Sequence, residues 1–264
     1  MRIAVVAPAC PVDRETAARV NAIAARDFAD VALVWHPQCF LEHGHFAGQD
    51  GLRENAFVEV ANDPAVDAVW FARGGYGSCR IAERALARLT RAAGDKAYLG
   101  YSDLGMILAG LYRHGIGRPV HGPMVADVRR DGGEAAIARA LRWLTTGGGA
   151  YDRPPRVAFN LTVLAALIGT SLQPDLAGHV LLLEDIDEHH YRIDRAMFQV
   201  TSAFPDLAGI KRGRFVVPAN NRDFGADVGA IFDHWCDVSG IAYLGTADIG
   251  HDADNSIVPF GVTA

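Results

Sequence analysis

The sequence predicts an α/β protein built as an N-terminal parallel-sheet domain, Rossmann- or flavodoxin-like, followed by a smaller C-terminal α/β domain. In residues 1–148, short apolar runs alternate with longer segments of helical spacing, which is typical of βαβ crossovers. A stretch rich in glycine and proline, residues 149–156, interrupts that alternation, and it then resumes. We therefore expect domains at 1–148 and 157–264, joined by a linker.

The N-terminal domain is expected to start with a strand and to alternate strands with helices. Strands are predicted where short apolar runs occur, at 3–7, 31–35, 68–71, 97–100 and 119–121. Helices are predicted where apolar residues and alanines recur at helical spacing, at 14–25, 80–92, 104–112 and 134–145.

The C-terminal domain is expected to contain fewer elements. Strands are predicted at 180–184, 214–218 and 242–244, and helices at 160–168, 191–203 and 227–236. The stretch 255–264 is short and apolar, and no repeat or low-complexity tract occurs.

Composition excludes several classes of partner. Half of the residues are apolar and 21% are charged, and a net charge of −6 argues against a nucleic-acid partner or an anionic membrane surface. No run approaches the roughly 18 apolar residues of a membrane span. The first residues read as a strand ended by Pro8 rather than as a signal peptide, and four scattered cysteines fit free thiols, so a cytoplasmic location is expected.

The stretch Gly100-Tyr101-Ser102-Asp103 lies between a predicted strand and a predicted helix. A serine in such a turn has an exposed hydroxyl, and the amide that follows it points to the same place, which suits a nucleophile with an oxyanion donor. The pattern departs from G-x-S-x-G, because the second glycine comes one place late, at Gly105. An ordinary helix N-cap is the alternative interpretation.

A glycine loop, Arg73-Gly74-Gly75-Tyr76-Gly77-Ser78, follows the third predicted strand. It lacks the G-x-G-x-x-G order of dinucleotide-binding loops, although a phosphate cradle stays possible. Loops at the carboxyl ends of neighbouring parallel strands share one crevice, so an oxyanion donor is a second interpretation. A tight turn without a ligand is the third.

Two further residues complete a candidate catalytic set. Glu184 ends an apolar strand, where a carboxylate can orient a histidine, and His251 lies in a turn rich in glycine and aspartate. The order Ser102, Glu184, His251 matches the serine–acid–histidine order of some hydrolases. A solvated strand end and an ordinary loop histidine are the alternatives.

Other polar clusters carry less chemistry. His36, Cys39, His43 and His45 lack the spacing of a zinc site and are expected in a surface loop, so no metal site is predicted. Cys79 is expected to be a packed thiol.

The chain resembles the LD-carboxypeptidase family of serine peptidases, which includes muramoyltetrapeptide carboxypeptidases and microcin C self-immunity peptidases. The matching pieces occur in family order: Ala7-Pro8, Phe71-Ala72-Arg73-Gly74-Gly75-Tyr76-Gly77, Gly100-Tyr101-Ser102-Asp103, His121-Gly122-Pro123-Met124, Asn160-Leu161, Leu183-Glu184-Asp185, Tyr191-Arg192-Ile193-Asp194-Arg195, Gly250-His251 and Pro259-Phe260-Gly261. They span both predicted domains.

The resemblance implies a nucleophile at Ser102, a base at His251 and an orienting acid at Glu184. It also implies an oxyanion hole from the amides of Asp103 and Gly75, an active site in the cleft between the domains, and a cytoplasmic homodimer. The implied reaction releases D-alanine from a murein tetrapeptide and needs no cofactor.

Two departures from the family pattern concern the substrate. The chain has Ala158-Phe159 where relatives commonly have Gly-Gly, and the interval from Met124 to Asn160 is short. Arg73 is expected to steer a substrate carboxylate, since an arginine fork matches that group, and Tyr101 is a further candidate for substrate contact.

Three rival functions stay open. They are an immunity-type peptidase acting on aminoacyl-nucleotide amides, a non-catalytic protein that binds a nucleotide or sugar through residues 74–77, and an inactive homologue.

Overall fold

A six-stranded sheet forms the first part of the molecule in the computed structural model, which describes residues 1–148 and 154–261. The strand order is β10-β5-β4-β3-β1-β2, in which β1 to β5 are parallel and β10 is antiparallel to β5. Without β10 this is the flavodoxin-like order 2-1-3-4-5. The strands are β1 (Arg2–Val6), β2 (Ala32–Trp35), β3 (Ala68–Phe71), β4 (Ala97–Gly100), β5 (Arg118–His121) and β10 (Val258–Pro259).

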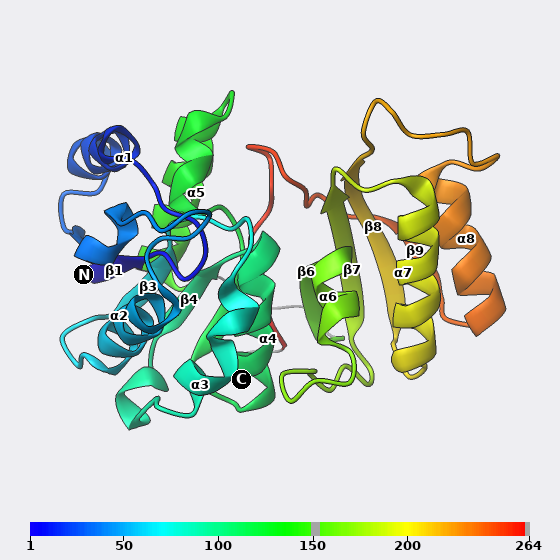
Figure 1. Ribbon diagram of the computed structural model, residues 1–264, viewed down its shortest axis with the longest axis horizontal. Helices are drawn as coiled ribbons and strands as arrows, with labels where there is room; N and C mark the ends of the chain where they lie inside the picture. The colour runs from blue at the N-terminus through cyan, green and yellow to red at the C-terminus, as the bar shows by residue number, and fades with distance from the viewer. Residues whose placement is uncertain (149–153, 262–264) are drawn as a thin grey trace.

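Helices cover both faces of this sheet (Figure 1). They are α1 (Arg14–Asp27), α2 (Asp50–Asn62), α3 (Ala82–Leu86), α4 (Gly105–Arg113) and α5 (Gly133–Thr146), with 3₁₀ turns η1 (Pro37–Phe40), η2 (Ser78–Arg80), η3 (Arg91–Ala93), η4 (Ser102–Leu104) and η5 (Val125–Arg129). Side chains of a strand alternate between faces. Ile3 and Val5 accordingly join an apolar cluster on the α1–α5 side, whereas Ala4 and Val6 join a second cluster with residues of α2, α3 and α4.

A four-stranded parallel sheet, in the order β6-β7-β8-β9, forms the second part. Its strands are β6 (Arg156–Asn160), β7 (Val180–Ile186), β8 (Gly209–Val216) and β9 (Tyr243–Thr246), and its helices are α6 (Leu161–Leu167), α7 (His190–Ala203) and α8 (Val228–Ser239). Asn160 caps α6 by accepting from the Val163 amide at 3.0 Å, and Asp227 caps α8 in the same way. Helices α7 and α8 pack together on the outer side of the sheet (Figure 1).

The two parts share one apolar core, because α4 packs against α6 and one buried cluster includes side chains of both sheets. Gly105 permits the close approach, since a Cβ there would lie 3.1 Å from Val163 Cγ1 and 3.3 Å from Phe159 Cδ1. The Phe260 ring, beyond β10, lies 5.0 Å from the Phe159 ring.

The mixed α/β architecture predicted from the sequence is confirmed, but several boundaries differ. Val258–Pro259 pair with β5, so part of the stretch assigned to the second domain completes the first sheet instead. Arg156, placed in the linker, begins β6; residues 149–153 of that linker lie outside the described residues.

Some elements were not predicted or were predicted too long. Helix α2 buries the charged Arg53 and Glu54, which breaks the apolar periodicity that identifies a helix. The helix predicted at 80–92 is divided into short pieces, and Asn62 of α2 accepts hydrogen bonds from the Thr90 amide and hydroxyl at 2.8 and 3.1 Å. Strand β8 starts at Gly209, whereas the prediction started it at 214. The first half of the strand was missed because it contains the charged Lys211 and Arg212, which interrupt the apolar run.

Candidate active site

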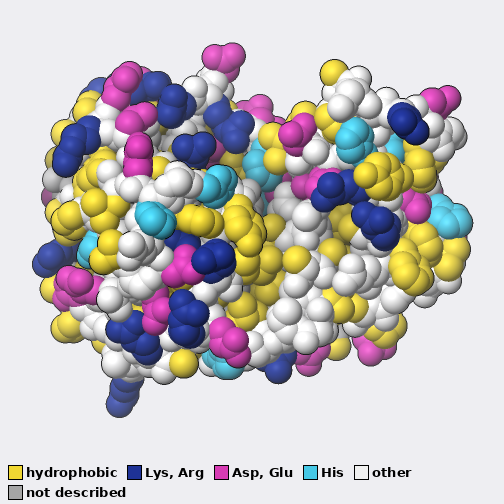
Figure 2. Space-filling view, viewed as in Figure 1, with side chains coloured by type: hydrophobic (Ala, Val, Ile, Leu, Met, Phe, Trp, Pro, Cys, Tyr) yellow, Lys and Arg dark blue, Asp and Glu magenta, His cyan; other side chains and the backbone are white. Residues whose placement is uncertain are grey.

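A cavity of about 500 Å³ lies between the two sheets, at the carboxyl ends of the strands of the first sheet. It is lined by Gly74 after β3, Ser102 after β4, Met124 after β5, Ile186 at the end of β7, and His251. Figure 2 shows the molecule hollowed between its two parts on this face. Loops at carboxyl strand ends are where ligands bind in open α/β sheets. The cleft is therefore the candidate active site.

Ser102 occupies a sharp turn between β4 and α4. Its φ of 59° lies in the left-handed region, which is uncommon for a non-glycine residue and strains the backbone. Gly100 precedes the turn, and a Cβ there would lie 2.7 Å from Phe71 Cδ2, so the strand end needs glycine. The strained turn presents the Ser102 side chain to the cavity.

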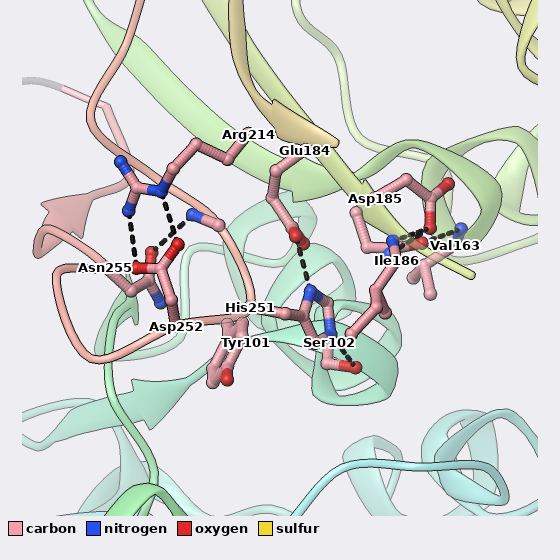
Figure 3. A network of polar contacts seen from close by, with 12 residues as sticks. Tyr101, Ser102, Val163, Glu184, Asp185, Ile186, Arg214, His251, Asp252 and Asn255 are labelled. Atoms are coloured by element: carbon pink, nitrogen blue, oxygen red, sulfur yellow. Dashed lines mark hydrogen bonds and ion pairs between the residues drawn. The ribbon is translucent and has the colours of Figure 1, made fainter. Parts of the chain in front are cut away.

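Three predicted side chains meet at this turn (Figure 3). The Oγ atom of Ser102 lies 3.0 Å from Nε2 of His251, and Nδ1 of His251 lies 2.5 Å from Oε2 of Glu184. Ser102 begins η4, just after β4 of the first sheet, Glu184 lies on β7 of the second, and His251 lies on the segment that crosses between β9 and β10. Residues far apart in the sequence thus form one continuous chain of polar contacts.

Burial dominates the electrostatics of this chain. Glu184 is fully buried, and desolvation raises its carboxyl pKa, although the hydrogen bond and the charge of His251 oppose the shift. When the carboxylate accepts from Nδ1–H, the proton is fixed on Nδ1 and Nε2 is left to accept from a hydroxyl. This arrangement suits His251 to remove a proton from Ser102.

The two predicted oxyanion donors lie on loops that border the cavity. Gly75 has a φ of 102°, and a Cβ there would lie 2.5 Å from Cys10 Sγ, so glycine is required. A Cβ on the neighbouring Gly74 would lie 3.1 Å from Ser102 Oγ, which shows how closely the loop approaches the serine.

Asp103 ties the glycine loop to the serine turn. Its carboxylate accepts from the Ser78 amide at 2.8 Å, and its carbonyl accepts from the Ser78 hydroxyl at 2.6 Å. Burial raises the pKa of the Asp103 carboxyl. The side chain therefore has a structural partner, while its backbone amide belongs to the first turn after Ser102.

The other two predicted substrate-binding residues also line the cavity. Arg73 is exposed, and its Nη1 donates to the Pro11 carbonyl at 3.4 Å. Tyr101 is buried, and its ring lies 4.9 Å from the His251 ring, while its hydroxyl donates to Asp127 at 2.9 Å. Tyr101 thus contacts the candidate catalytic histidine directly.

The histidine-rich stretch forms no metal centre in the part of the chain that the structure describes. Cys39 is buried against the Val5 carbonyl, and His36 accepts from the Gln38 amide. The expectation of a packed thiol at Cys79 is wrong, since Cys79 is the middle residue of η2 and is exposed.

Sequence reasoning missed several residues around the site. Arg129 and Arg130 line the cavity together with Arg73. His121 is buried, and its Nε2 lies 2.9 Å from Oδ1 of Asn255. Two signals were available, the buried strand end at His121 and the run of arginines after Met124, but neither indicates its partner.

Two family models match the chain, one in each half of the sequence. A model described as the LD-carboxypeptidase N-terminal domain matches residues 3–122, and the LD-carboxypeptidase C-terminal domain matches residues 156–264. The two matches together cover most of the sequence and define a two-domain peptidase. The chain belongs to the LD-carboxypeptidase family.

Individual relatives cover most of the chain. A probable murein peptide carboxypeptidase of Bacillus subtilis is 30% identical over 84% of this chain and 76% of its own length. The murein tetrapeptide carboxypeptidase of Pseudomonas aeruginosa is 25% identical over 100% of this chain and 92% of its own. The crystal structure of muramoyltetrapeptide carboxypeptidase from Oxalobacter formigenes shares the fold, with a TM-score of 0.81 and 24% identity over 99% of this chain and 93% of that one.

The short interval between Met124 and Asn160 forms η5, α5 and β6 in its described residues. Phe159, one of the residues that depart from the family pattern, packs against Phe260 and beneath Gly105. No helix of the described chain is both long enough and apolar enough to cross a bilayer.

Proposed function

We propose that this protein is a serine carboxypeptidase that hydrolyses an L,D-peptide bond and releases the terminal D-alanine of a murein tetrapeptide. The observation that carries the proposal is the continuous contact from Ser102 Oγ to His251 Nε2, at 3.0 Å, and from His251 Nδ1 to Glu184, at 2.5 Å. These are the distances over which a nucleophile, a base and an orienting acid act together.

The proposed reaction begins with proton transfer from the Ser102 hydroxyl to His251 as the oxygen attacks the scissile carbonyl. The developing oxyanion is held by the backbone amides of Asp103 and Gly75, and losing one such donor typically costs about 3 kcal/mol. His251 then gives the proton to the leaving D-alanine amine, which leaves an acyl-enzyme on Ser102. Water, deprotonated by His251, hydrolyses this ester and restores the serine. Every step uses protein groups and water alone.

The substrate class is supported by the relatives and by the charge of the cavity wall. Two relatives carry names that specify a murein peptide or a murein tetrapeptide. Arg73, Arg129 and Arg130 line the cavity, and an arginine fork pairs well with a carboxylate. Arg129 already pairs with Asp13 and Arg130 with Asp127, so the exposed Arg73 is the best placed of the three to meet a substrate carboxylate. A murein tetrapeptide carries several carboxylates, including the terminal one next to the scissile bond. Arg73 is proposed to pair with that terminal group and Tyr101 to shape the adjacent wall.

A cytoplasmic homodimer is the proposed setting, by resemblance to the family. Light scattering on the purified chain tests the dimer, and cell fractionation tests the location. A monomer at working concentrations would remove the dimer from the proposal without affecting the chemistry.

The decisive experiment measures D-alanine release from purified murein tetrapeptide. We expect turnover by the wild type and by Ser171→Ala, a control serine whose hydroxyl contacts Glu83 on the surface, and a loss of several orders of magnitude for Ser102→Ala. Equal rates for wild type and Ser102→Ala would refute the serine mechanism. An aminoacyl sulfamoyl adenylate, assayed beside the tetrapeptide, tests the immunity-type alternative. Nucleotide binding without labelling of Ser102 by a fluorophosphonate would favour a binding protein.

A further inference from the structure

Strand β8 carries a bulge directly beside Glu184. Leu183 of β7 pairs with Arg212 of β8, but Asp185 pairs with Phe215, so Glu184 alone faces both Gly213 and Arg214. An extra residue of this kind bends a strand and re-aims its side chains, and such bulges occur frequently next to active sites. The bulge therefore lies opposite the candidate acid Glu184, and it determines where the Arg214 side chain points.

The segment that carries His251 packs closely against this bulge at Gly213. A Cβ there would lie 2.8 Å from the Ile249 carbonyl oxygen, closer than real Cβ atoms approach, and 3.0 Å from Glu184 Cβ. The Arg214 amide donates to the same Ile249 carbonyl at 2.8 Å. The backbone two residues before His251 is thus fixed over Glu184 by a glycine and a hydrogen bond.

The Arg214 side chain holds the same segment from a second direction (Figure 3). Its guanidinium pairs with Asp252, with Nη2 2.7 Å from Oδ1 and Nε in contact with Oδ2, and its Nη1 pairs with Asp248. Asp248 lies three residues before His251 and Asp252 directly follows it, so the two acids that pair with Arg214 flank the histidine in the sequence. Hydrogen bonds to Asp252 raise the pKa of Arg214. Burial acts to raise the pKa of Asp252, but Arg214 outweighs it and the net shift is downward.

Groups of the first part of the molecule hold the other end of the segment, at Asn255. Asn255 Oδ1 accepts from the Gly250 amide at 3.2 Å and contacts His121 Nε2 at the end of β5. Arg139 of α5 donates to the Asn255 carbonyl at 3.0 Å. His121 on β5 and Arg139 on α5 belong to the first part of the molecule, whereas Arg214 belongs to the second sheet. The segment that carries His251 is therefore held by groups from both parts, the one that contains Ser102 and the one that contains Glu184.

We propose that Arg214 is a positioning residue for His251, which acts through Asp252 and Asp248 to hold the imidazole in line between Glu184 and Ser102. The inference rests on the proposed function, because it assigns a role in that reaction. Arg214 touches neither Ser102 nor Glu184 through its side-chain hydrogen bonds, so it does not take part in the proton transfers themselves.

The test compares Arg214→Met, Arg214→Lys and a control, Arg26→Met. Arg26 is a surface arginine that pairs with Asp27 and Glu134 and lies outside the cavity lining. A displacement of reacting groups of about 1 Å reduces rates by up to about 100-fold. We expect kcat of Arg214→Met to fall by about 10- to 100-fold with little change in KM, and Arg214→Lys to recover part of the loss, since lysine keeps the charge without the fork. Arg26→Met is expected to behave as wild type.

A second readout does not depend on turnover. The proton between His251 Nδ1 and Glu184 is expected to give a far-downfield proton resonance in the wild type, identified by its loss in Glu184→Gln. Arg214→Met should broaden or abolish this resonance, while far-UV circular dichroism shows that the protein is folded. Where Arg214→Met does not fold, Asp252→Asn, which keeps the Asp248 pair, replaces it and is expected to change kcat and the resonance in the same direction.

Wild-type kcat together with an unchanged resonance in a folded Arg214→Met or Asp252→Asn variant would overturn the positioning role. The proposed function fails in a different way, when the wild type neither releases D-alanine nor reacts at Ser102 with a fluorophosphonate. In that case the resonance alone still decides whether Arg214 orients His251.

Discussion

His121 provides a prediction about stability that can be worked out from its surroundings. The imidazole is buried at the end of β5, edge-to-face with Tyr101 at 5.5 Å, and contacts Asn255 Oδ1 at 2.9 Å. Burial lowers its pKa from 6.5 to about 4, with a smaller downward contribution from His251, while the contact with Asn255 opposes the shift. Folded His121 is therefore neutral over a range in which an unfolded histidine is charged.

The sign and size of the effect follow from proton linkage. Above pH 6.5 neither state binds the proton, so His121 carries no pH-dependent penalty. As the pH falls from 6.5 to about 4, the unfolded state takes up the proton first and the folded state loses stability. One pKa unit corresponds to about 1.4 kcal/mol, so the shift amounts to about 3 kcal/mol over this window.

The experiment compares the wild type with His121→Gln, whose amide can donate to Asn255 but does not titrate. The free energy of unfolding is measured by urea denaturation at several pH values across the window. Whatever offset the substitution causes near neutral pH, we expect it to shift by about 3 kcal/mol in favour of His121→Gln as the pH approaches 4. His114→Gln, on the surface, controls for the change of residue. An offset that stays constant across the window would refute the buried, neutral histidine.

Three further substitutions test the strained turn, the glycine loop and the shared core. Ser102→Gly is expected to abolish D-alanine release. The same change should raise the free energy of unfolding by about 1 kcal/mol, because glycine adopts the left-handed φ without strain. A lower free energy of unfolding for this variant in urea titrations would contradict the strain argument. Gly75→Ala should reduce kcat by about 100-fold, since its Cβ meets Cys10 Sγ and its φ of 102° is strained for alanine. Adding Cys10→Gly should restore the part of the rate that the contact with Cys10 costs, and wild-type kcat in Gly75→Ala would contradict the need for glycine. Phe260→Ala should cost about 3–5 kcal/mol in chemical denaturation, because the ring lies between both parts, and a loss below about 1 kcal/mol would show that it is not part of their core.

Local hydrophobicity patterns predicted those strands and helices in which buried positions are apolar. The bounds of β3 and β4 agree with the prediction, because each is a short apolar run closed by a change in residue type. Helix α2 and strand β6 were not predicted. In α2, buried Arg53 pairs with Asp50, and Glu54 pairs with Arg84 of α3 and with Arg88. Charged side chains thus occupy buried positions, whereas a hydrophobicity pattern assigns charged residues to the solvent.

The candidate site likewise contains residues that the sequence could predict and contacts that it could not. Ser102, Glu184 and His251 could be nominated from residue type, local context and resemblance, and the structure brings their side chains into contact. The bulge at Gly213 and the ion pairs of Arg214 could not, because strand register and a pairing across β8 and the crossing segment depend on the tertiary fold. Long-range partners were the information that the sequence lacked.

The return of β10 to the first sheet has a consequence for biosynthesis. Strand β5 emerges from the ribosome well before its neighbour β10, since all four strands of the second sheet lie between them in the sequence. Until β10 is made, β5 is an open edge with unpaired backbone groups, and such edges recruit other strands. His251 lies on the same late segment, so a nascent chain has an unpaired β5 edge and an incomplete candidate site until this last segment has been translated.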